Sequence, residues 1–341
     1  MISGRLFALI KIYILTNQNA GIKVHLQENY VKIWQCIVST ASVCLFLGCG
    51  SGGPSNTVER EPTTLSIVAT TTMVADMVQA VCGDRAEVIS LMGPGVDPHL
   101  YKPVASDLAK LRAADAIFYN GLMLEGKMSE LLAARDRAFP VTEMVDASKL
   151  IAPEEGGDHH DPHLWGDIAL WAECVAGVSN SLCAMDPDGI KIYEINAASY
   201  IQDLLALDRW VKDKVSEVPE NHRVLITSHD AFNYLGRAYG FEVVAVQGIS
   251  TVAEAGLGDI TKTVDFIKSH EVKSIFVETS VNKAMIMRIA EDAGVGIGGE
   301  LFSDAMGAPG TMHSVGGETY DEGTFEGMVK HNVNTIVSAL K

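Results

Sequence analysis

The chain has 341 residues, 48% of them apolar and 20% charged, which is enough for two or three domains with buried cores. Its 43 acidic and 26 basic residues give a formal net charge of −17. This acidity argues against electrostatic binding to nucleic acid or to an anionic membrane, and it favours cations as partners. The six cysteines form no CxxC pair, so zinc-ribbon and thioredoxin-like sites have no support.

The N-terminal region has the pattern of an export signal. Residues 33–47 (IWQCIVSTASVCLFL) are apolar, long enough for a signal-peptide core but short of the roughly 20 residues that span a membrane. The run ends just before Cys49, and a Gly/Ser/Pro-rich stretch follows, as at a bacterial lipoprotein processing site. A buried apolar segment with a chance cysteine is the alternative. We predict a signal peptide over 1–48 and a flexible tether over 49–62, lipid-anchored through Cys49 in the bacterial cell envelope.

The rest of the chain alternates β-prone runs with helical patterns, which predicts α/β architecture with mostly parallel sheets. The alternation occurs twice, so we expect an N-terminal lobe over 63–186 and a C-terminal lobe over 219–341. Expected strands are 65–69, 86–91, 116–119, 223–227, 242–246 and 274–277. Expected helices are 73–81, 106–113, 127–134, 232–239, 260–269, 282–293 and 325–340.

A single long helix is expected between the lobes, over 187–218. Apolar residues recur there every three or four positions, Pro187 suits its start, and Pro219 stops it. About 28 residues at 1.5 Å each would span roughly 42 Å. Such a rigid connection predicts small lobe movements rather than a wide hinge. Cys174 and Cys183 lie too far apart along a helix to bridge each other. Cys82 could pair with one of them, but no feature of the sequence indicates it, and we expect buried free thiols.

Four loop segments place metal-binding side chains after strands or before helices. His99 lies in GPGVDPHLY (93–101), and His163 in DPHLW, which repeats the Asp-Pro-His-Leu-aromatic pattern. His229 and Asp304 lie in two further loops, TSHDAF and LFSDAMG. Ligands of open α/β folds gather at the carboxyl ends of strands, and imidazole with carboxylate suits zinc, iron and manganese. Each histidine taken alone is more often a surface or helix-capping residue than a ligand, but the pattern that occurs twice favours ligands at His99 and His163.

Four acidic residues are candidates for hydrogen-bonding these ligands and so fixing their orientation. Asp97 and Asp161 could each accept from the far ring nitrogen of the neighbouring histidine and set its tautomer. Asp230 could do so for His229 or could cap a helix, and Glu278 could support a ligand or form a salt bridge. The acidic tract ending at His159-His160 could collect cations or be a solvated loop. His313 is expected to be a surface-loop residue.

Six stretches of the chain resemble the metal-specific solute-binding lipoproteins of bacterial manganese, zinc and iron ABC importers, often called adhesin-like. The resemblance implies two α/β lobes joined by a rigid helix, with one divalent transition-metal ion as cargo in the cleft between them. It implies His99, His163, His229 and Asp304 as the ligands. The matching stretches are GPGVDPHLYKP (93–103), YNGLMLEGKM (119–128), DPHLWGD (161–167), TSHDAFNYLGRAYG (227–240), IFVETSVNK (275–283) and ELFSDAMG (300–307).

The function that the resemblance implies is capture of Mn²⁺ or Zn²⁺, with iron as a third option, and delivery to an integral-membrane permease with its cytoplasmic ATPase. The protein would be a non-enzymatic monomer that contacts the membrane through its anchor only. Glu at the third ligand position is associated in the family with manganese, and all-His sites with zinc. This chain combines His229 with Asp304 and lacks a long His-rich loop, so the metal stays open. The alternatives are an exported metallohydrolase with a His₃Asp site, which lacks an HExxH motif, and a surface adhesin.

Overall fold

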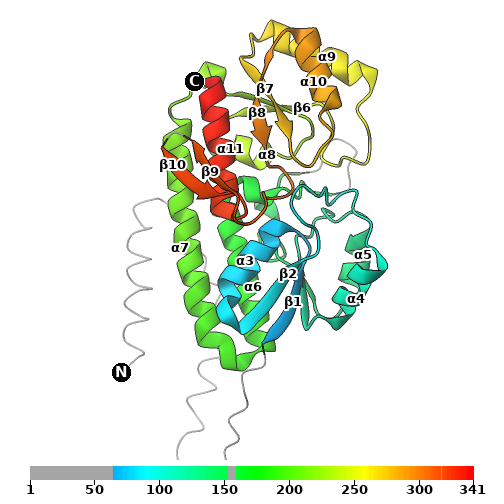
Figure 1. Ribbon diagram of the computed structural model, residues 1–341, viewed down its shortest axis with the longest axis vertical. Helices are drawn as coiled ribbons and strands as arrows, with labels where there is room; N and C mark the ends of the chain where they lie inside the picture. Colours follow the sequence, from blue (N-terminus) through cyan, green and yellow to red (C-terminus); the bar gives the residue numbers. More distant parts are fainter. Residues whose placement is uncertain (1–63, 153–158, 316) are drawn as a thin grey trace, which may run out of the picture. The chain divides into compact units, whose positions relative to one another are not determined.

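The computed structural model describes residues 64–152, 159–315 and 317–341. The expected signal peptide, the tether, Cys49 and most of the acidic tract before His159 lie outside the described residues. The two α/β lobes and the long helix are present as the sequence predicts (Figure 1).

The N-terminal lobe is built on a parallel four-stranded sheet in the order β2-β1-β3-β4. Its central strand, β1 (Leu65–Ala69), is continuously apolar at its buried end, as expected where both faces are covered. The next helix begins at a threonine cap, because the Thr71 side chain accepts from the backbone N–H of Val74. The remaining elements are β2 (Ala86–Ser90), β3 (Ala116–Tyr119), β4 (Ala138–Pro140), α3 (Thr72–Cys82), α4 (Ala105–Ala113) and α5 (Met128–Ala133).

The C-terminal lobe contains two parallel strand pairs, β5 (Val224–Thr227) with β6 (Glu242–Ala245) and β7 (Ser274–Glu278) with β8 (Gly296–Leu301). An antiparallel hairpin follows, with strands β9 (Met312–Val315) and β10 (Glu318–Asp321). The helices of this lobe are α8 (Asn233–Tyr239), α9 (Leu257–Ser269), α10 (Ala284–Ala293) and α11 (Phe325–Leu340).

Strand β8 was not predicted, because its sequence, GIGGEL, is poor in β-formers. The glycine at 298 is required because helix α11 packs closely against this strand. A Cβ at Gly298 would lie 2.7 Å from the Cβ of Ala339 on α11, so the glycine lets the terminal helix approach the sheet. Strand β4 and the β9–β10 hairpin were also not predicted.

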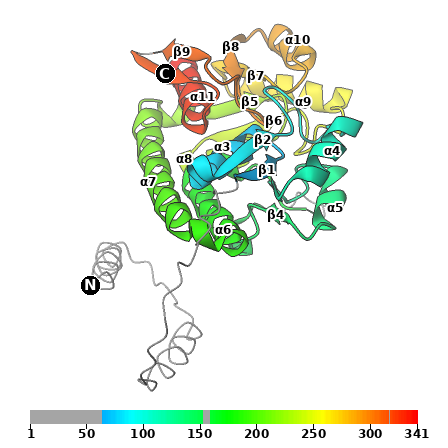
Figure 2. The same ribbon diagram turned by 60° about the horizontal axis from the view of Figure 1, so that its bottom comes forward.

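Helices α6 (Ile168–Met185) and α7 (Ile190–Val215) pack side by side (Figure 2), and α7 contacts both α3 of the N-terminal lobe and α11 of the C-terminal lobe. The predicted long helix is therefore present, with a short 3₁₀ turn at Pro187–Gly189 before it. Among the described helices, α6 has the length and apolar composition of a membrane span, but half of it is buried in the protein. We interpret α6 as a core helix, because it packs against α3 and α7.

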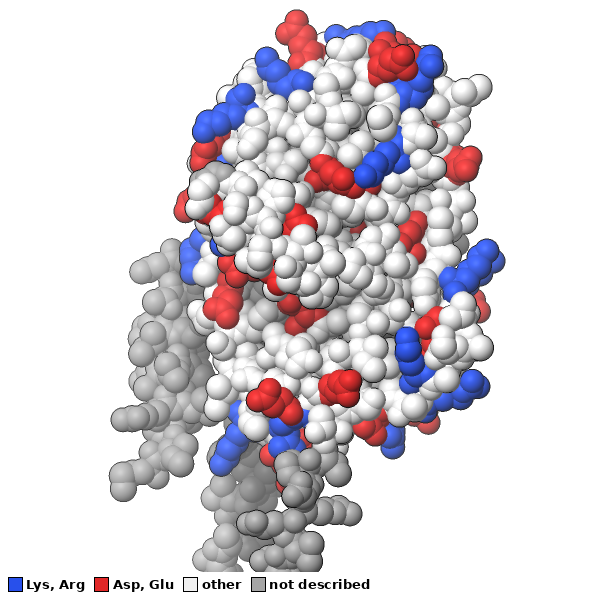
Figure 3. Space-filling model, in the orientation of Figure 1, with Lys and Arg blue, Asp and Glu red and all other residues white. Residues whose placement is uncertain are grey.

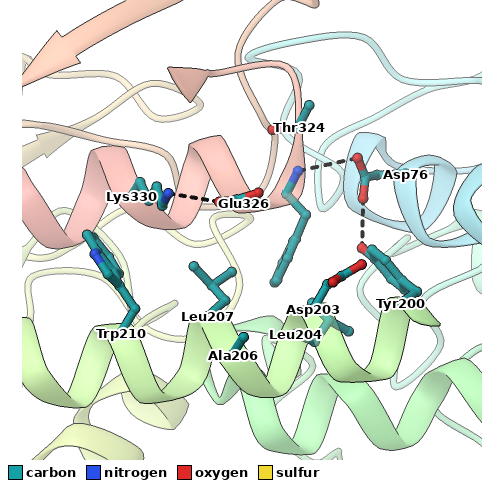
Figure 4. A pocket seen from close by; sticks show the side chains of 11 residues that line it. Asp76, Tyr200, Asp203, Leu204, Ala206, Leu207, Trp210, Thr324, Glu326 and Lys330 are labelled. Carbon is teal, nitrogen blue, oxygen red and sulfur yellow. Dashed lines mark hydrogen bonds and ion pairs between the residues drawn. The ribbon is translucent and has the colours of Figure 1, made fainter. Parts of the chain in front are cut away.

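Helix α7 connects the lobes through a shared hydrophobic core rather than as a bare linker. One cluster of buried side chains extends from Ile67 in β1 through α3, α6 and α7 to Leu340 in α11. Figure 4 shows a polar bridge beside it: Asp76 on α3 accepts from the Tyr200 hydroxyl at 2.7 Å and from the backbone N–H of Phe325 at 3.3 Å. Burial raises the pKa of Asp76, and these two bonds oppose that rise. A cavity of about 420 Å³ lies here between α7 and α11.

The three described cysteines carry free thiols, as expected. Cys82 and Cys174 are buried, and Cys183 is half-buried. Burial, with a smaller contribution from Asp186, raises the pKa of the Cys82 thiol to about 12, so it stays protonated and unreactive at neutral pH.

Candidate metal centre

The structure brings the four predicted ligand residues together between the lobes. His99 follows β2, His163 precedes α6, His229 follows β5, and Asp304 follows β8. One donor atom from each lies within 4.8 Å of the donors of the other three, and all four residues are buried. The carboxyl ends of strands in two lobes therefore converge on one small polar cluster inside the protein.

The spacing of the donor atoms matches a small tetrahedral ion. His99 Nε2 lies 3.3 Å from His163 Nε2, and the Asp304 carboxylate lies 3.5 Å from His163 Nε2 and 3.2 Å from His229 Nε2. A tetrahedron whose corners lie about 2.0–2.1 Å from its centre has edges of about 3.3 Å. Moreover, His229 Nε2 and Asp304 Oδ1 are buried without a hydrogen-bond partner. A bound cation satisfies both atoms.

Asp161 lies beside the ring of His163. Its Oδ1 accepts from the backbone N–H of His163 at 2.9 Å and lies 2.7 Å from the ring Nδ1. A proton on Nδ1 leaves the lone pair of Nε2 directed at the cluster. Asp161 is itself held by Asn233 at 3.2 Å, so the pair is anchored to the C-terminal lobe.

Glu278 plays the same part for His229. It ends β7, is fully buried, and accepts from the backbone N–H of His229 at 2.9 Å and from the ring Nδ1 at 2.5 Å. Both roles considered for Glu278 use this contact, which supports the ring of His229 and becomes an ion pair when that ring is charged. Because Nδ1 already faces Glu278, the ring-supporting role does not fall to Asp230. Helix α8 begins at Asn233 with Phe232 as its N-cap, so Asp230 lies two residues before that cap.

Asp97 does not hold the ring of His99 as expected. Its Oδ1 accepts from the backbone N–H of His99 at 2.8 Å, and its Oδ2 accepts from the hydroxyl of Thr251 at 2.6 Å. The first contact is a tight turn across Pro98 like that of Asp161, but the second oxygen of Asp97 is taken by Thr251. The second contact joins the two lobes at the rim of the cluster.

Electrostatics at the centre favours positive charge beside Asp304. Burial raises the pKa of Asp304, but His229 and His163 outweigh it and hold that pKa well below its usual range. Burial likewise opposes protonation of His163, yet Asp161 and Asp304 raise its pKa to about 9. The pKa of His229 is raised by Asp304 and Glu278 against burial, whereas burial lowers that of His99 to about 3. A divalent ion bound beside Asp304 would therefore compete with protons for His163 and His229.

Contacts between the lobes brace the loop that carries Asp304. The indole N–H of Trp165, two residues after His163, donates to the carbonyl of Ser303 at 2.9 Å. On the other side of Asp304, the backbone N–H of Met306 donates to the hydroxyl of Thr72 at 2.8 Å. The position of the carboxylate is thus set by groups of the N-terminal lobe as well as its own.

Sequence analysis missed a further buried carboxylate, Glu125, which hydrogen-bonds to loops of the N-terminal lobe. It accepts from the hydroxyl of Thr70 at 2.8 Å and from the backbone N–H groups of Asn120 and Gly121. Asn120 in turn donates to the carbonyl of Pro162, next to His163. Glu125 lies in YNGLMLEGKM, which was noted as a matching stretch without a role. Nothing in that pattern separates it from a surface glutamate.

The backbone of Gly126, in the stretch YNGLMLEGKM, lies too close to the His99 loop for any side chain. Its φ is +50°, and a Cβ there would lie 2.7 Å from the carbonyl oxygen of His99. The histidine loop therefore rests directly on the Gly126 backbone. The repeated pattern around His99 gives no sign of this dependence on a distant residue.

The other histidines singled out from sequence lie elsewhere. His160 Nδ1 pairs with the carbonyl of Ile151 at 3.0 Å, and neither His159 nor His160 belongs to the four-residue cluster. His313 is not in a loop as expected but on β9. On the face drawn in Figure 3, basic and acidic side chains are interspersed rather than gathered into a basic patch.

Two α/β lobes joined by one long helix, with a buried His₃Asp cluster between them, define a two-lobe metal-ion-binding protein. The family described as zinc-uptake complex component A, periplasmic, matches residues 67–339. The chain is 40% identical to the manganese-binding lipoprotein MntA of Bacillus subtilis, over 86% of this chain and 94% of that protein. It is 42% identical to the zinc-binding protein TroA of Treponema pallidum, over 80% and 88% respectively.

The fold agrees with these sequence relationships. The solved structure of the periplasmic zinc-binding protein TroA from Treponema pallidum superposes with a TM-score of 0.76, covering 81% of this chain and 99% of that one, at 40% identity. The chain belongs to the zinc-uptake component A family, the substrate-binding proteins of manganese, zinc and iron ABC importers. The resemblance noted from its motifs is therefore confirmed.

Proposed function

We propose that the protein captures one divalent transition-metal ion, Mn²⁺ or Zn²⁺ with iron as a third option, outside the cytoplasm and delivers it to an ABC permease. The ligands are His99, His163, His229 and Asp304. The observation that carries this proposal is the convergence of four buried donors, with His229 Nε2 3.2 Å from Asp304 Oδ2 and with His229 Nε2 and Asp304 Oδ1 both lacking a hydrogen-bond partner.

Transport rather than catalysis is supported by the number of donors. Four protein donors fill a tetrahedral ion, whereas catalytic zinc sites keep one position for water or substrate. A metallohydrolase would also need a general base in reach of an open position. The carboxylates nearest the cluster, Asp161 and Glu278, are both engaged by histidine rings. The protein therefore acts as a carrier and has no hydrolytic role.

Delivery implies a membrane partner. Substrate-binding proteins of ABC importers work with a permease and its cytoplasmic ATPase, and this chain is proposed to do so as a monomer tethered through Cys49. The ion joins loops from both lobes, so loaded and empty proteins differ on the surface around the cleft. That difference is what a permease needs to recognise.

The test is native mass spectrometry of the full-length chain after metal removal. At one equivalent of metal we expect one tightly held ion, and an Asp304→Ala variant should hold none at the same concentration. A matched Asp259→Ala variant, at an exposed position on α9, should bind as the unaltered chain does. Offering Zn²⁺ and Mn²⁺ together, then Mn²⁺ alone, ranks the two metals. Tight binding that survives Asp304→Ala would refute the proposed site.

A further inference from the structure

A second group of metal-ligand side chains lies outside the interlobe centre. His313 on β9, Glu322 just after β10, and His331 on α11 each direct one donor atom to a common point, with all three atoms within 4.8 Å of one another. The group shares no residue with the first cluster. It joins the hairpin and the terminal helix, two elements that the capture of the cargo ion does not require.

The hydrogen bonding of His331 makes this group unusual. Its Nε2 lies 2.9 Å from the carbonyl of Glu300, so the ring hydrogen of the neutral imidazole belongs on that nitrogen. The Nδ1 lone pair then faces Oε1 of Glu322 at 3.1 Å, and Nδ1 is buried without a hydrogen-bond partner. A lone pair opposite a carboxylate oxygen is repulsive unless a proton or a metal ion lies between them, and the second imidazole at the same oxygen favours the metal ion.

His313 completes the arrangement from the opposite side. Its Nδ1 lies 3.1 Å from the same Oε1 of Glu322. The ring of His313 stacks on Tyr320, with centroids 5.8 Å apart, and the ring of His331 meets the edge of Phe302 at 4.8 Å. Both imidazoles are therefore held in place by aromatic neighbours, which orients their Nδ1 atoms toward Glu322.

We propose that His313, Glu322 and His331 form a second site for a divalent transition-metal ion of the zinc class. Two imidazole nitrogens and one carboxylate oxygen are a donor set typical of zinc, and the 3.1 Å separations approach the tetrahedral edge of about 3.3 Å. The His313 side chain is 42% exposed, so water reaches the ion and completes its coordination. This site binds more weakly and exchanges faster than the buried centre.

The second site is connected to the loop that carries Asp304. The backbone N–H of Gly307 donates to the carbonyl of Glu322 at 2.9 Å, and the N–H of Glu322 donates to the carbonyl of Thr311 at 3.0 Å. An ion on Glu322 therefore braces residues 307–311 against α11. The ligand is a free hydrated cation, since nothing larger is needed to satisfy the three donors.

The experiment separates the two sites by substitution. The full-length chain is stripped of metal and titrated with Zn²⁺, and with Co²⁺ as a visible-absorption probe, beyond the first equivalent. We expect a second, weaker ion per chain. A His313→Ala variant should bind that ion more than about 100-fold less tightly. Removing a group that only hydrogen-bonds to a metal ligand already lowers metal affinity about 10–100-fold, and His313 is itself a proposed ligand. The variant should keep the first ion at the interlobe centre. Retention of that ion shows, in the same measurement, that the variant is folded.

Two further variants complete the test. His270→Ala removes an exposed histidine at the end of α9 and should leave both ions in place. His163→Ala should remove the tight ion while the weaker one remains, which distinguishes failure of the interlobe centre from failure of this proposal. Absence of a second ion, or a second ion that survives His313→Ala, would overturn the proposal. An ion lost only on His159→Ala would belong to the loop at His159-His160 instead.

Discussion

Replacing Glu278 by glutamine is the most informative single change at the metal centre. The carboxylate accepts two hydrogen bonds from one residue, from the backbone N–H of His229 at 2.9 Å and from its ring Nδ1 at 2.5 Å. Glutamine keeps the shape but offers one oxygen and one NH₂ group. One of the two donors on His229 must then face another donor, or the ring must shift its hydrogen to Nε2, where it blocks the metal.

The expected loss follows from the bond that is weakened. A hydrogen bond to a charged group contributes about 1.5–3 kcal/mol. Since 1.4 kcal/mol corresponds to a tenfold change in affinity, Glu278→Gln should weaken metal binding about 10- to 150-fold. This agrees with the 10–100-fold effect of other carboxylates that support ligating histidines.

The assay is a competition titration of the metal-stripped protein against a chromophoric chelator near neutral pH, with Zn²⁺ and Mn²⁺ in turn. Thermal unfolding of the metal-free variant shows that it is folded. Glu300→Gln is the matched control, because Glu300 pairs with Lys283 at the surface and its side chain is 42% exposed. Affinity unchanged in a folded Glu278→Gln protein would refute the argument that this carboxylate orients the His229 ligand.

Three other predictions address the ligands, the protons and the loops. His99→Ala should abolish tight binding in calorimetry while the metal-free protein still melts cooperatively; a lost transition would make His99 a structural residue. His163, whose folded pKa is raised to about 9, stabilises the metal-free protein below its ordinary pKa of 6.5 and less as pH rises through 9. The gain in Tm on adding Zn²⁺ should therefore increase from pH 6 to pH 9, and a constant gain would contradict this coupling. Gly126→Ala should destabilise the protein by about 1–3 kcal/mol in urea unfolding, whereas Gly93→Ala, with nothing within 4 Å of the added Cβ, should be nearly neutral.

Periodicity and spacing alone anticipated most of the architecture. The long helix was readable because its apolar stripe is regular from Tyr193 to Val215 and is bounded by Pro187 and Pro219. The elements that were missed lack such signals. β8 is rich in glycine because α11 packs against it, and the β9–β10 hairpin derives its stability from contacts with α11 that sequence alone does not display.

The ligands were easier to anticipate than their supports. The duplicated Asp-Pro-His-Leu pattern marks His99 and His163, yet it cannot say that Asp161 binds its neighbour's ring while Asp97 binds only the main chain and Thr251. That difference depends on the backbone of each turn and on the opposite lobe. Likewise, Glu278 is distant in sequence from His229, and only the packing of β7 beside β5 brings the two together.

The shared core limits how the protein can signal that it is loaded. Buried side chains from β1 to α11 form one cluster around α7, so swinging one lobe away from the other would expose apolar surface at about 25 cal/mol per Å². The donor atoms of the four proposed ligands lie within 4.8 Å of one another. Metal binding then needs only small movements of the loops that carry His99, His229 and Asp304, whose contacts with the opposite lobe include the Asp97–Thr251 bond at the rim. We therefore expect the loaded and empty forms to differ mainly in the surface at the mouth of the cleft. A permease can contact that surface without separating the lobes.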